Sequence, residues 1–135
     1  MTPHFSTPEV LIRTGNGYEA ILWEDFSFFR STGEEVVFKR LGWTDGASSP
    51  AIIWSKFPPF GPYWKSAFGH DLLYRYSSRP KEECDEIFKE MMEADGVDGG
   101  TVMVLYNAVK YFGQESFDND RKQQTERVEQ NEKIN

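Results

Sequence analysis

Alternating hydrophobic and polar residues in the first forty positions are typical of β-strands. Four runs are rich in β-branched and aromatic side chains, at 10–13, 18–24, 26–30 and 35–40. Glycine-containing sequences suited to tight turns, at 14–17 and 31–34, separate the first run from the second and the third from the fourth. The pattern predicts an antiparallel β-meander of three to five strands, with one face under helices.

After residue 61 the apolar side chains recur at helical spacing instead. The spacing predicts three helices, over about 62–76, 80–95 and 98–113. Pro62 and Pro80 suit the first turns of the first two helices, and Asp98 suits the N-cap of the third. We therefore expect a layer of three helices against the predicted sheet.

Two segments show neither periodicity. Residues 41–62 combine small residues and prolines with large aromatic side chains, which predicts a long but ordered loop. Residues 114–135 are nearly free of apolar groups, so they form either a solvated helical extension or a disordered tail. The predicted fold class is α+β: an N-terminal antiparallel β-meander, a long ordered loop, and a three-helix layer packed on the sheet. A single domain would span 1–113, followed by a polar tail over 114–135.

Charge and cysteine content narrow the classes of partner. The 135-residue chain has a net charge of −7 and no basic stripe, which argues against nucleic acid or an anionic membrane surface as a partner. It has no apolar run of transmembrane length and no leader of signal-peptide type, so we expect no membrane insertion. The single cysteine, Cys84, excludes an internal disulfide and favours folding inside a cell. Because Cys84 lies in an apolar helical stripe, we do not expect a thiol nucleophile.

Candidate chemistry centres on residues 67–76, which place His70, Asp71 and Tyr74 in an otherwise apolar and aromatic helix. A buried carboxylate is costly unless it meets a cation, a metal ion or several hydrogen-bond donors. Antiparallel packing of the first two helices could bring Asp85 to the level of His70. With Asp45 from the loop, these groups would suit a divalent cation, calcium or zinc, or an acid–base pair.

Each candidate also has a structural interpretation. Asp45 can cap its own loop through an Asx-turn, and His70 can be a core histidine bonded to a strand carbonyl. Asp71 can pair with a nearby basic residue, and Asp85 can be an ordinary exposed acid. The residues themselves leave both interpretations open.

Five short motifs, in order, resemble the family catalogued as domain of unknown function 1353. They are TDGASSP at 44–50, PPFGPY at 58–63, HDLLY at 70–74, CDEIF at 84–88 and LYNAVKYFG at 105–113. The sequence departs from the family pattern by having Cys84 where alanine is usual. The resemblance implies a bacteriophage or prophage setting, without implying an activity. It also implies the signature positions Asp45, Ser48, His70, Asp71, Tyr74 and Asp85.

The HDLLY segment is also similar to the H-D-x-C-Y helix of calcium-dependent secreted phospholipases. In those enzymes the histidine is a general base for water and the aspartate binds calcium. This chain lacks their paired cysteines and the glycine-rich calcium loop directly before the helix. The likeness is therefore one of chemistry rather than of fold.

Two functional hypotheses follow. In the first, Asp45, Asp71 and Asp85 bind a divalent cation or orient His70, which activates water against an ester or amide of envelope or cell-wall material. The catalytic residues would be His70, Asp71 and Asp45, supported by Ser48, Tyr74 and Asp85. In the second, the protein is a non-enzymatic phage virion or accessory protein, and the same cluster is structural. In either case we expect it in the host cytoplasm or the virion, with other virion proteins or a cell-envelope component as partners.

Overall fold

The computed structural model describes residues 1–7, 12–14, 20–44 and 63–134. Within these ranges, strands come first and helices follow, which confirms the α+β class. The strands are β1 (His4–Phe5), β2 (Ile12–Thr14), β3 (Ala20–Leu22), β4 (Phe26–Phe29), β5 (Glu35–Phe38) and β6 (Trp43–Thr44). The helices are α2 (Trp64–Tyr76), α3 (Lys81–Ala94), α4 (Gly99–Phe112) and α5 (Gln114–Ile134). Of the loop expected over 41–62, residues 41–44 form a turn and the short strand β6 instead, and residues 45–62 lie outside the described residues.

The strands divide into two antiparallel sheets, of order β1-β4-β5 and β2-β3-β6, rather than forming one meander. Both expected hairpin pairs are present, β2 with β3 and β4 with β5. The second edge of β3 pairs with β6, and the second edge of β4 pairs with β1. Alternation along the chain predicts strands but does not specify which edges pair, because pairing partners can be distant in sequence.

The three predicted helices are present close to their expected bounds. At the start of α4, the side chain of Asp98 accepts a hydrogen bond from the Thr101 amide at 3.0 Å, as expected of an N-cap. Gly96, after the end of α3, has a φ of +75°, in the region that favours glycine. None of the helices in the described part of the chain has the length and apolar character needed to cross a bilayer.

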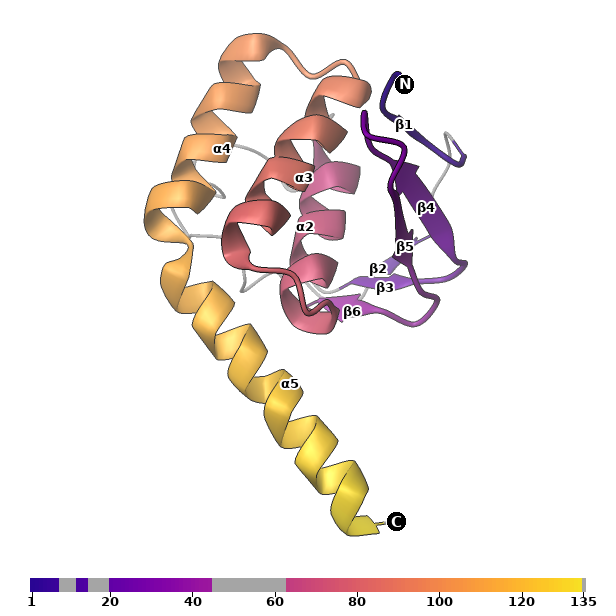
Figure 1. Ribbon diagram of the computed structural model, residues 1–135, viewed down its shortest axis with the longest axis vertical. Coiled ribbons are helices and arrows are strands. Elements are labelled where there is room, and N and C mark those ends of the chain that lie inside the picture. The colour runs from indigo at the N-terminus through magenta and orange to yellow at the C-terminus, as the bar shows by residue number, and fades with distance from the viewer. Residues whose placement is uncertain (8–11, 15–19, 45–62, 135) are drawn as a thin grey trace.

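Helix α2 is the centre of the molecule and is buried on most of its sides. In Figure 1 the strands lie to the right of α2 and α3, and α4 lies on the left. Gly69 permits this packing, because a side-chain carbon there would lie 3.2 Å from Met91 of α3 and 3.3 Å from Phe38 of β5. One hydrophobic cluster joins the strands to α2 and α3, and a second joins α3 to α4.

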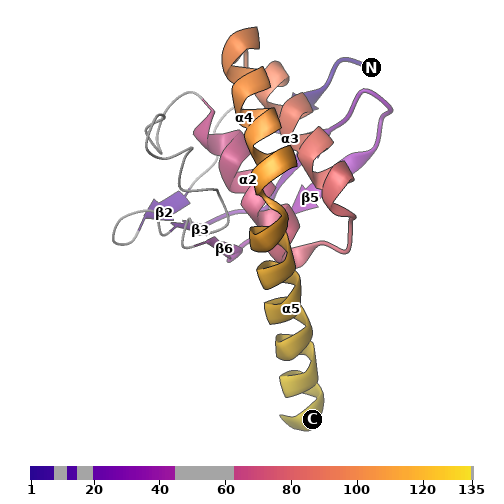
Figure 2. The same ribbon diagram turned by 90° about the vertical axis from the view of Figure 1, so that its left-hand side faces the viewer.

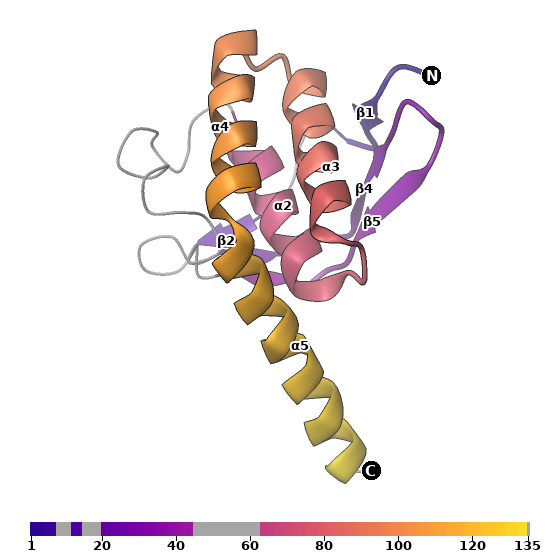
Figure 3. The same ribbon diagram turned by 60° about the vertical axis from the view of Figure 1, so that its left-hand side comes forward.

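Residues 114–134 of this polar segment form one helix, α5. Its beginning packs beside α2: Phe117 contacts the main hydrophobic cluster, and its ring centroid lies 5.2 Å from that of Tyr74. The rest of α5 projects away from the other elements in Figures 1, 2 and 3. The first turns of α5 are therefore part of the packed structure, although their sequence is mostly polar.

Candidate functional site

A buried carboxylate on α3 collects three polar partners. Asp85 Oδ1 accepts a hydrogen bond from the Tyr74 hydroxyl at 2.6 Å and lies 2.8 Å from His70 Nε2. Asp85 Oδ2 accepts from Lys81 Nζ at 2.8 Å. The exposed fractions are 1% for His70, 0% for Tyr74, 7% for Lys81 and 2% for Asp85. We call these four residues the Asp85 network; it is sealed inside the protein.

Local helix geometry builds this network in pairs. His70 and Tyr74 are one turn apart on α2, and Lys81 and Asp85 are one turn apart on α3, so each pair shares a helix face. The short connection between α2 and α3 folds the two faces onto each other. One structural interpretation from the sequence is wrong, since Asp85 is not an exposed acid. His70 is a core histidine, and its Nε2 meets Asp85.

Lys81 extends the network to a third helix. Its Nζ also donates to the backbone carbonyls of Val109 at 2.8 Å and Lys110 at 3.3 Å. These carbonyls lie in the last turn of α4, where a cation is favoured by the helix dipole. Sequence reasoning did not select Lys81, although its four-residue spacing from Asp85 was a usable signal.

The polar partners set the ionisation of Asp85. Burial by itself raises the pKa of this carboxyl, but the hydrogen bonds from His70, Lys81 and Tyr74 and the His70 charge outweigh it, and the net pKa lies below the ordinary 3.8. An ionised carboxylate has no proton to donate, so His70 Nε2 carries the hydrogen of their shared bond. Burial, together with the neighbouring Asp85 charge, raises the pKa of Tyr74, so its hydroxyl remains a donor.

The lowered pKa of Asp85 predicts a loss of stability in acid. Because the folded pKa lies below the unfolded one, the contribution of Asp85 is complete above the unfolded pKa and disappears as pH falls through the folded pKa. We expect the free energy of unfolding to decrease as the pH drops below about 4. Urea unfolding of wild type and Asp85→Asn between pH 2.5 and 7 measures this. The free energy of unfolding should change less steeply with pH in the variant than in the wild type. Equal slopes in the two proteins would contradict the prediction.

Asp71 lies next to His70 but about 100° around the helix, and it is also buried. One turn further on, Arg75 is buried as well, with its guanidinium 3.7 Å from Asp120 of α5 and 5.0 Å from the Trp43 ring centroid. Arg75 therefore contacts α5 and β6, apart from the Asp85 network. Its guanidinium and the Asp120 carboxylate form an ion pair that is taken out of water.

The remaining candidates, Asp45 and Ser48, lie outside the described residues. Within the ranges that are described, no three His, Cys, Asp or Glu side chains come together in a way that could hold a metal ion. The cation set of Asp45, Asp71 and Asp85 stays a prediction, since Asp45 cannot be placed. Of the six sequence candidates, the structure brings together His70, Tyr74 and Asp85.

Cys84 is predicted to be inert toward thiol reagents. It is fully buried, and burial raises the pKa of its thiol to about 11. At pH 8 we expect a thiol-exchange reagent to label native protein about a hundredfold more slowly than protein in denaturant. Absorbance of the released chromophore measures both rates. Rapid labelling of the native chain would show that the region around Cys84 opens.

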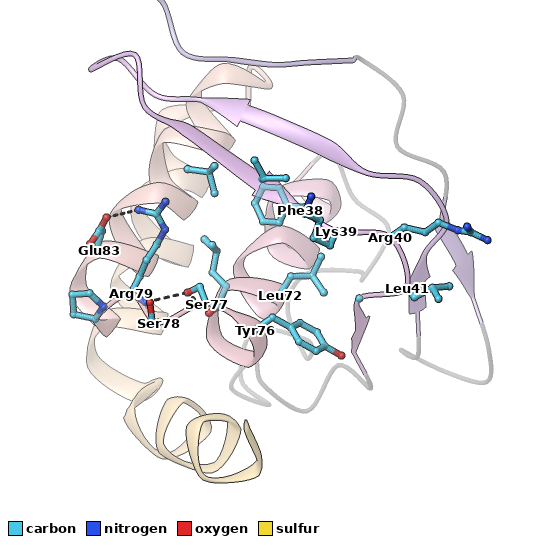
Figure 4. Close-up of a pocket in the computed structure, with 15 residues that line it drawn as sticks. Phe38, Lys39, Arg40, Leu41, Leu72, Tyr76, Ser77, Ser78, Arg79 and Glu83 are labelled. Carbon is cyan, nitrogen blue, oxygen red and sulfur yellow. Dashed lines mark hydrogen bonds and ion pairs between the residues drawn. The ribbon is translucent and has the colours of Figure 1, made fainter. Parts of the chain in front are cut away.

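An open hollow lies elsewhere, between β5 and the connection from α2 to α3. It has a volume of about 880 Å³ and is lined by residues 36–42 on one side, and by α2 residues including Leu72, Leu73 and Tyr76 and residues 77–80 on the other. Figure 4 shows Leu72, Tyr76 and Arg79 on one side, with Phe38, Lys39 and Leu41 across from them. None of the four members of the Asp85 network lines it. The accessible cavity and the buried polar network are thus separate features.

Comparison with known proteins identifies the family. A family model described as protein of unknown function (DUF1353) matches residues 20–109, more than half of the chain. Searches of curated proteins and of solved structures found no significant match. The matched range contains the strands from β3 onward, the Asp85 network and the hollow. The chain belongs to the DUF1353 family.

Proposed function

We propose that this chain is a non-enzymatic interaction protein of bacteriophage type, in which the Asp85 network is structural. One observation carries the proposal: both oxygens of Asp85 are occupied by groups of the protein itself, at exposures of 7% or less for every member. A general base needs a lone pair within reach of its substrate. Both Asp85 oxygens are directed at donors of α2 and α3, and His70, the candidate base, is 1% exposed.

The electrostatics support the same conclusion. Catalytic acids and bases work best when their pKa is close to the operating pH. The pKa of Asp85 is lowered instead, as in a structural ion pair, and that of Tyr74 is raised away from neutrality. Lys81 joins Asp85 to the end of α4. Such a network fixes how three helices pack. On this proposal, the function of the protein lies in binding partners at its surface.

A test of this proposal combines a search for turnover with the location of the protein. Purified wild type and His70→Gln are assayed on chromogenic esters and amides, with calcium or zinc added. Antibody detection then follows the chain through gradient-purified particles of the phage or induced prophage. We expect that no substrate is turned over in a His70-dependent way. We also expect to recover the chain in a complex with particle or accessory proteins. Hydrolysis by wild type that His70→Gln abolishes would overturn the proposal.

A hydrolytic role is the second candidate, and one contact favours it. His70 Nε2 lies 2.8 Å from Asp85, the arrangement in which a carboxylate orients an imidazole for general-base work. In this role Asp71 and Asp45 would bind a divalent cation or supply a second carboxylate that orients His70, and Ser48 and Tyr74 would support the site. Titration calorimetry with calcium and zinc, on wild type and Asp71→Asn, tests it. Heat of binding in the wild type that the variant lacks would support this role.

A further inference from the structure

Strand β5 forms one wall of the hollow and has an edge that no described strand pairs with. The direction of its backbone groups follows from the ladder with β4. The Arg30 amide donates to the Glu34 carbonyl at 2.9 Å, so this pair is of the hydrogen-bonded type. Such pairs alternate along an antiparallel ladder, so Val36 and Phe38 bond to β4 while Glu35 and Val37 do not.

The hydrogen bonds between β4 and β1 give the same alternation of backbone directions independently. Ser27, which stands opposite Val37, uses its carbonyl for a bond from the Ser6 amide at 2.8 Å, on the far side of β4. The N–H and C=O groups of Glu35 and Val37 therefore point outward from the sheet, at the edge with which no described strand pairs. Seven consecutive residues, 36–42, line the hollow, so the strand and the turn after it run along the cavity.

The charges around the hollow are unbalanced. Its lining contains three cationic side chains, Lys39, Arg40 and Arg79, and one carboxylate, Glu83. Glu83 forms an ion pair with Arg79, which also reaches Glu34 at 2.9 Å. Lys39 and Arg40 are exposed at the end of β5. Arg79 is balanced by its two carboxylates, and Asp25 accepts a hydrogen bond from the Arg40 amide at 2.6 Å. Lys39 is therefore the cation of the lining that favours a negative group on a partner.

The turn that follows β5 holds an apolar side chain at the rim. Leu41 has a φ of +73°, a region in which a leucine is strained and a glycine is not, and its side chain is 60% exposed. The turn is held by bonds from the Leu41 amide to the Leu22 carbonyl at 2.7 Å and from the Gly42 amide to the Lys39 carbonyl at 3.2 Å. Across from it, Leu72 and Leu73 line the hollow from the core, at 4% exposure each, and the ring of Tyr76 is 45% exposed. Backbone strain that presents an exposed leucine is typical of a binding site.

We propose that the β5 edge binds an extended peptide segment of a partner protein as an added strand. The peptide backbone bonds to the outward groups of Glu35 and Val37, its apolar side chains contact Leu41 and Tyr76, and a carboxylate meets Lys39. The proposal rests on the proposed interaction function and specifies its surface and the chemistry of the partner. Backbone pairing supplies affinity, and the charge and apolar contacts supply selectivity.

A displayed library of random decapeptides provides the probe. Selection on the wild-type protein should enrich peptides with alternating apolar residues and at least one acidic residue. The affinity of a selected synthetic peptide is then measured by fluorescence anisotropy. Val37→Pro removes an outward N–H without touching the β4 ladder and should weaken binding about tenfold or more. The matched control Val37→Thr keeps that N–H and should bind within about twofold of wild type.

Two further variants test the other contacts. Lys39→Glu should weaken binding of the acidic peptide, and the wild-type affinity should fall with added salt. Leu41→Gly should weaken binding while the melting temperature stays level or rises, because glycine relieves the strain at this φ. A peptide methylated on alternate amide nitrogens, with the protein unchanged, should also bind about tenfold more weakly. That arm remains informative if Val37→Pro fails to fold.

Several outcomes would overturn the peptide site. These are absence of enrichment, equal affinity for wild type and folded Val37→Pro, or equal affinity for plain and methylated peptides. Concentration-dependent dimers that Val37→Pro abolishes, with no peptide enriched, would assign the edge to a second copy of the chain and would also overturn it. None of these results decides the proposed function, which the turnover assay and the particle fractionation test on their own.

Discussion

Replacing Asp85 with asparagine is expected to lower the free energy of unfolding by about 3 kcal/mol or more, because it leaves a buried cation without its counter-charge. Lys81 would keep its two carbonyl acceptors on α4 but lose the carboxylate 2.8 Å from its Nζ. His70 and Tyr74 would lose the negative charge of their shared acceptor. Such a loss is a large fraction of the stability of a domain of this size.

Urea unfolding at pH 7 measures this effect, and a double variant identifies its source. Lys81→Met in the Asp85→Asn background removes the isolated charge, so it should restore part of the lost stability. Glu86→Gln changes an exposed carboxylate one position away and should stay within about 0.5 kcal/mol of wild type. If Asp85→Asn and Glu86→Gln have equal stability, the Asp85 network does not hold the helices together.

Removing all of α5 is expected to unfold the protein or to cost about 4 kcal/mol, whereas removing only its last part should cost little. Arg121 donates from Nε to the Tyr74 carbonyl at 2.8 Å and from Nη2 to the Leu73 carbonyl at 3.2 Å, so α5 caps the end of α2. Hydrogen bonds from a charged group contribute about 1.5–3 kcal/mol. Loss of the partly buried Phe117 ring adds about 1.5 kcal/mol.

Two truncations, ending at residues 113 and 125, separate the packed part of α5 from its projecting part. Thermal and urea unfolding should give the chain ending at 125 a stability within about 1 kcal/mol of the full chain. Arg121→Ala should account for part of the loss in the shorter chain, and the exposed neighbour Lys122→Ala should be neutral. Equal stability of the two truncated chains would contradict a capping role for α5.

The packing of α5 shows what a hydrophobic pattern cannot detect. Besides Phe117, the side of α5 that faces α2 carries Asp120, Arg121 and Gln124. Asp120 forms an ion pair with a side chain of α2, and the other two donate hydrogen bonds to backbone carbonyls of α2. These residues recur at helical spacing, but they are polar, so the sequence alone read as a solvated extension or a disordered tail. Their partners are a buried guanidinium and the last carbonyls of α2, and those become available only once α2 is folded and buried.

Sequence by itself predicted four strand-forming runs, three of the helices and the buried centre of this protein. Spacing of apolar residues gave the helices and the β-rich start, because periodicity reports which side of a helix or strand faces the core. The cost of burying charge pointed to the helix carrying His70 and Asp71.

Tertiary structure decided which strand edges pair, that Lys81 completes the network around Asp85, and that β5 has an edge beside a hollow with which no described strand pairs. Each of these is a contact between segments distant in the chain. A local pattern carries no information on such partners, since their identity depends on how the whole chain packs.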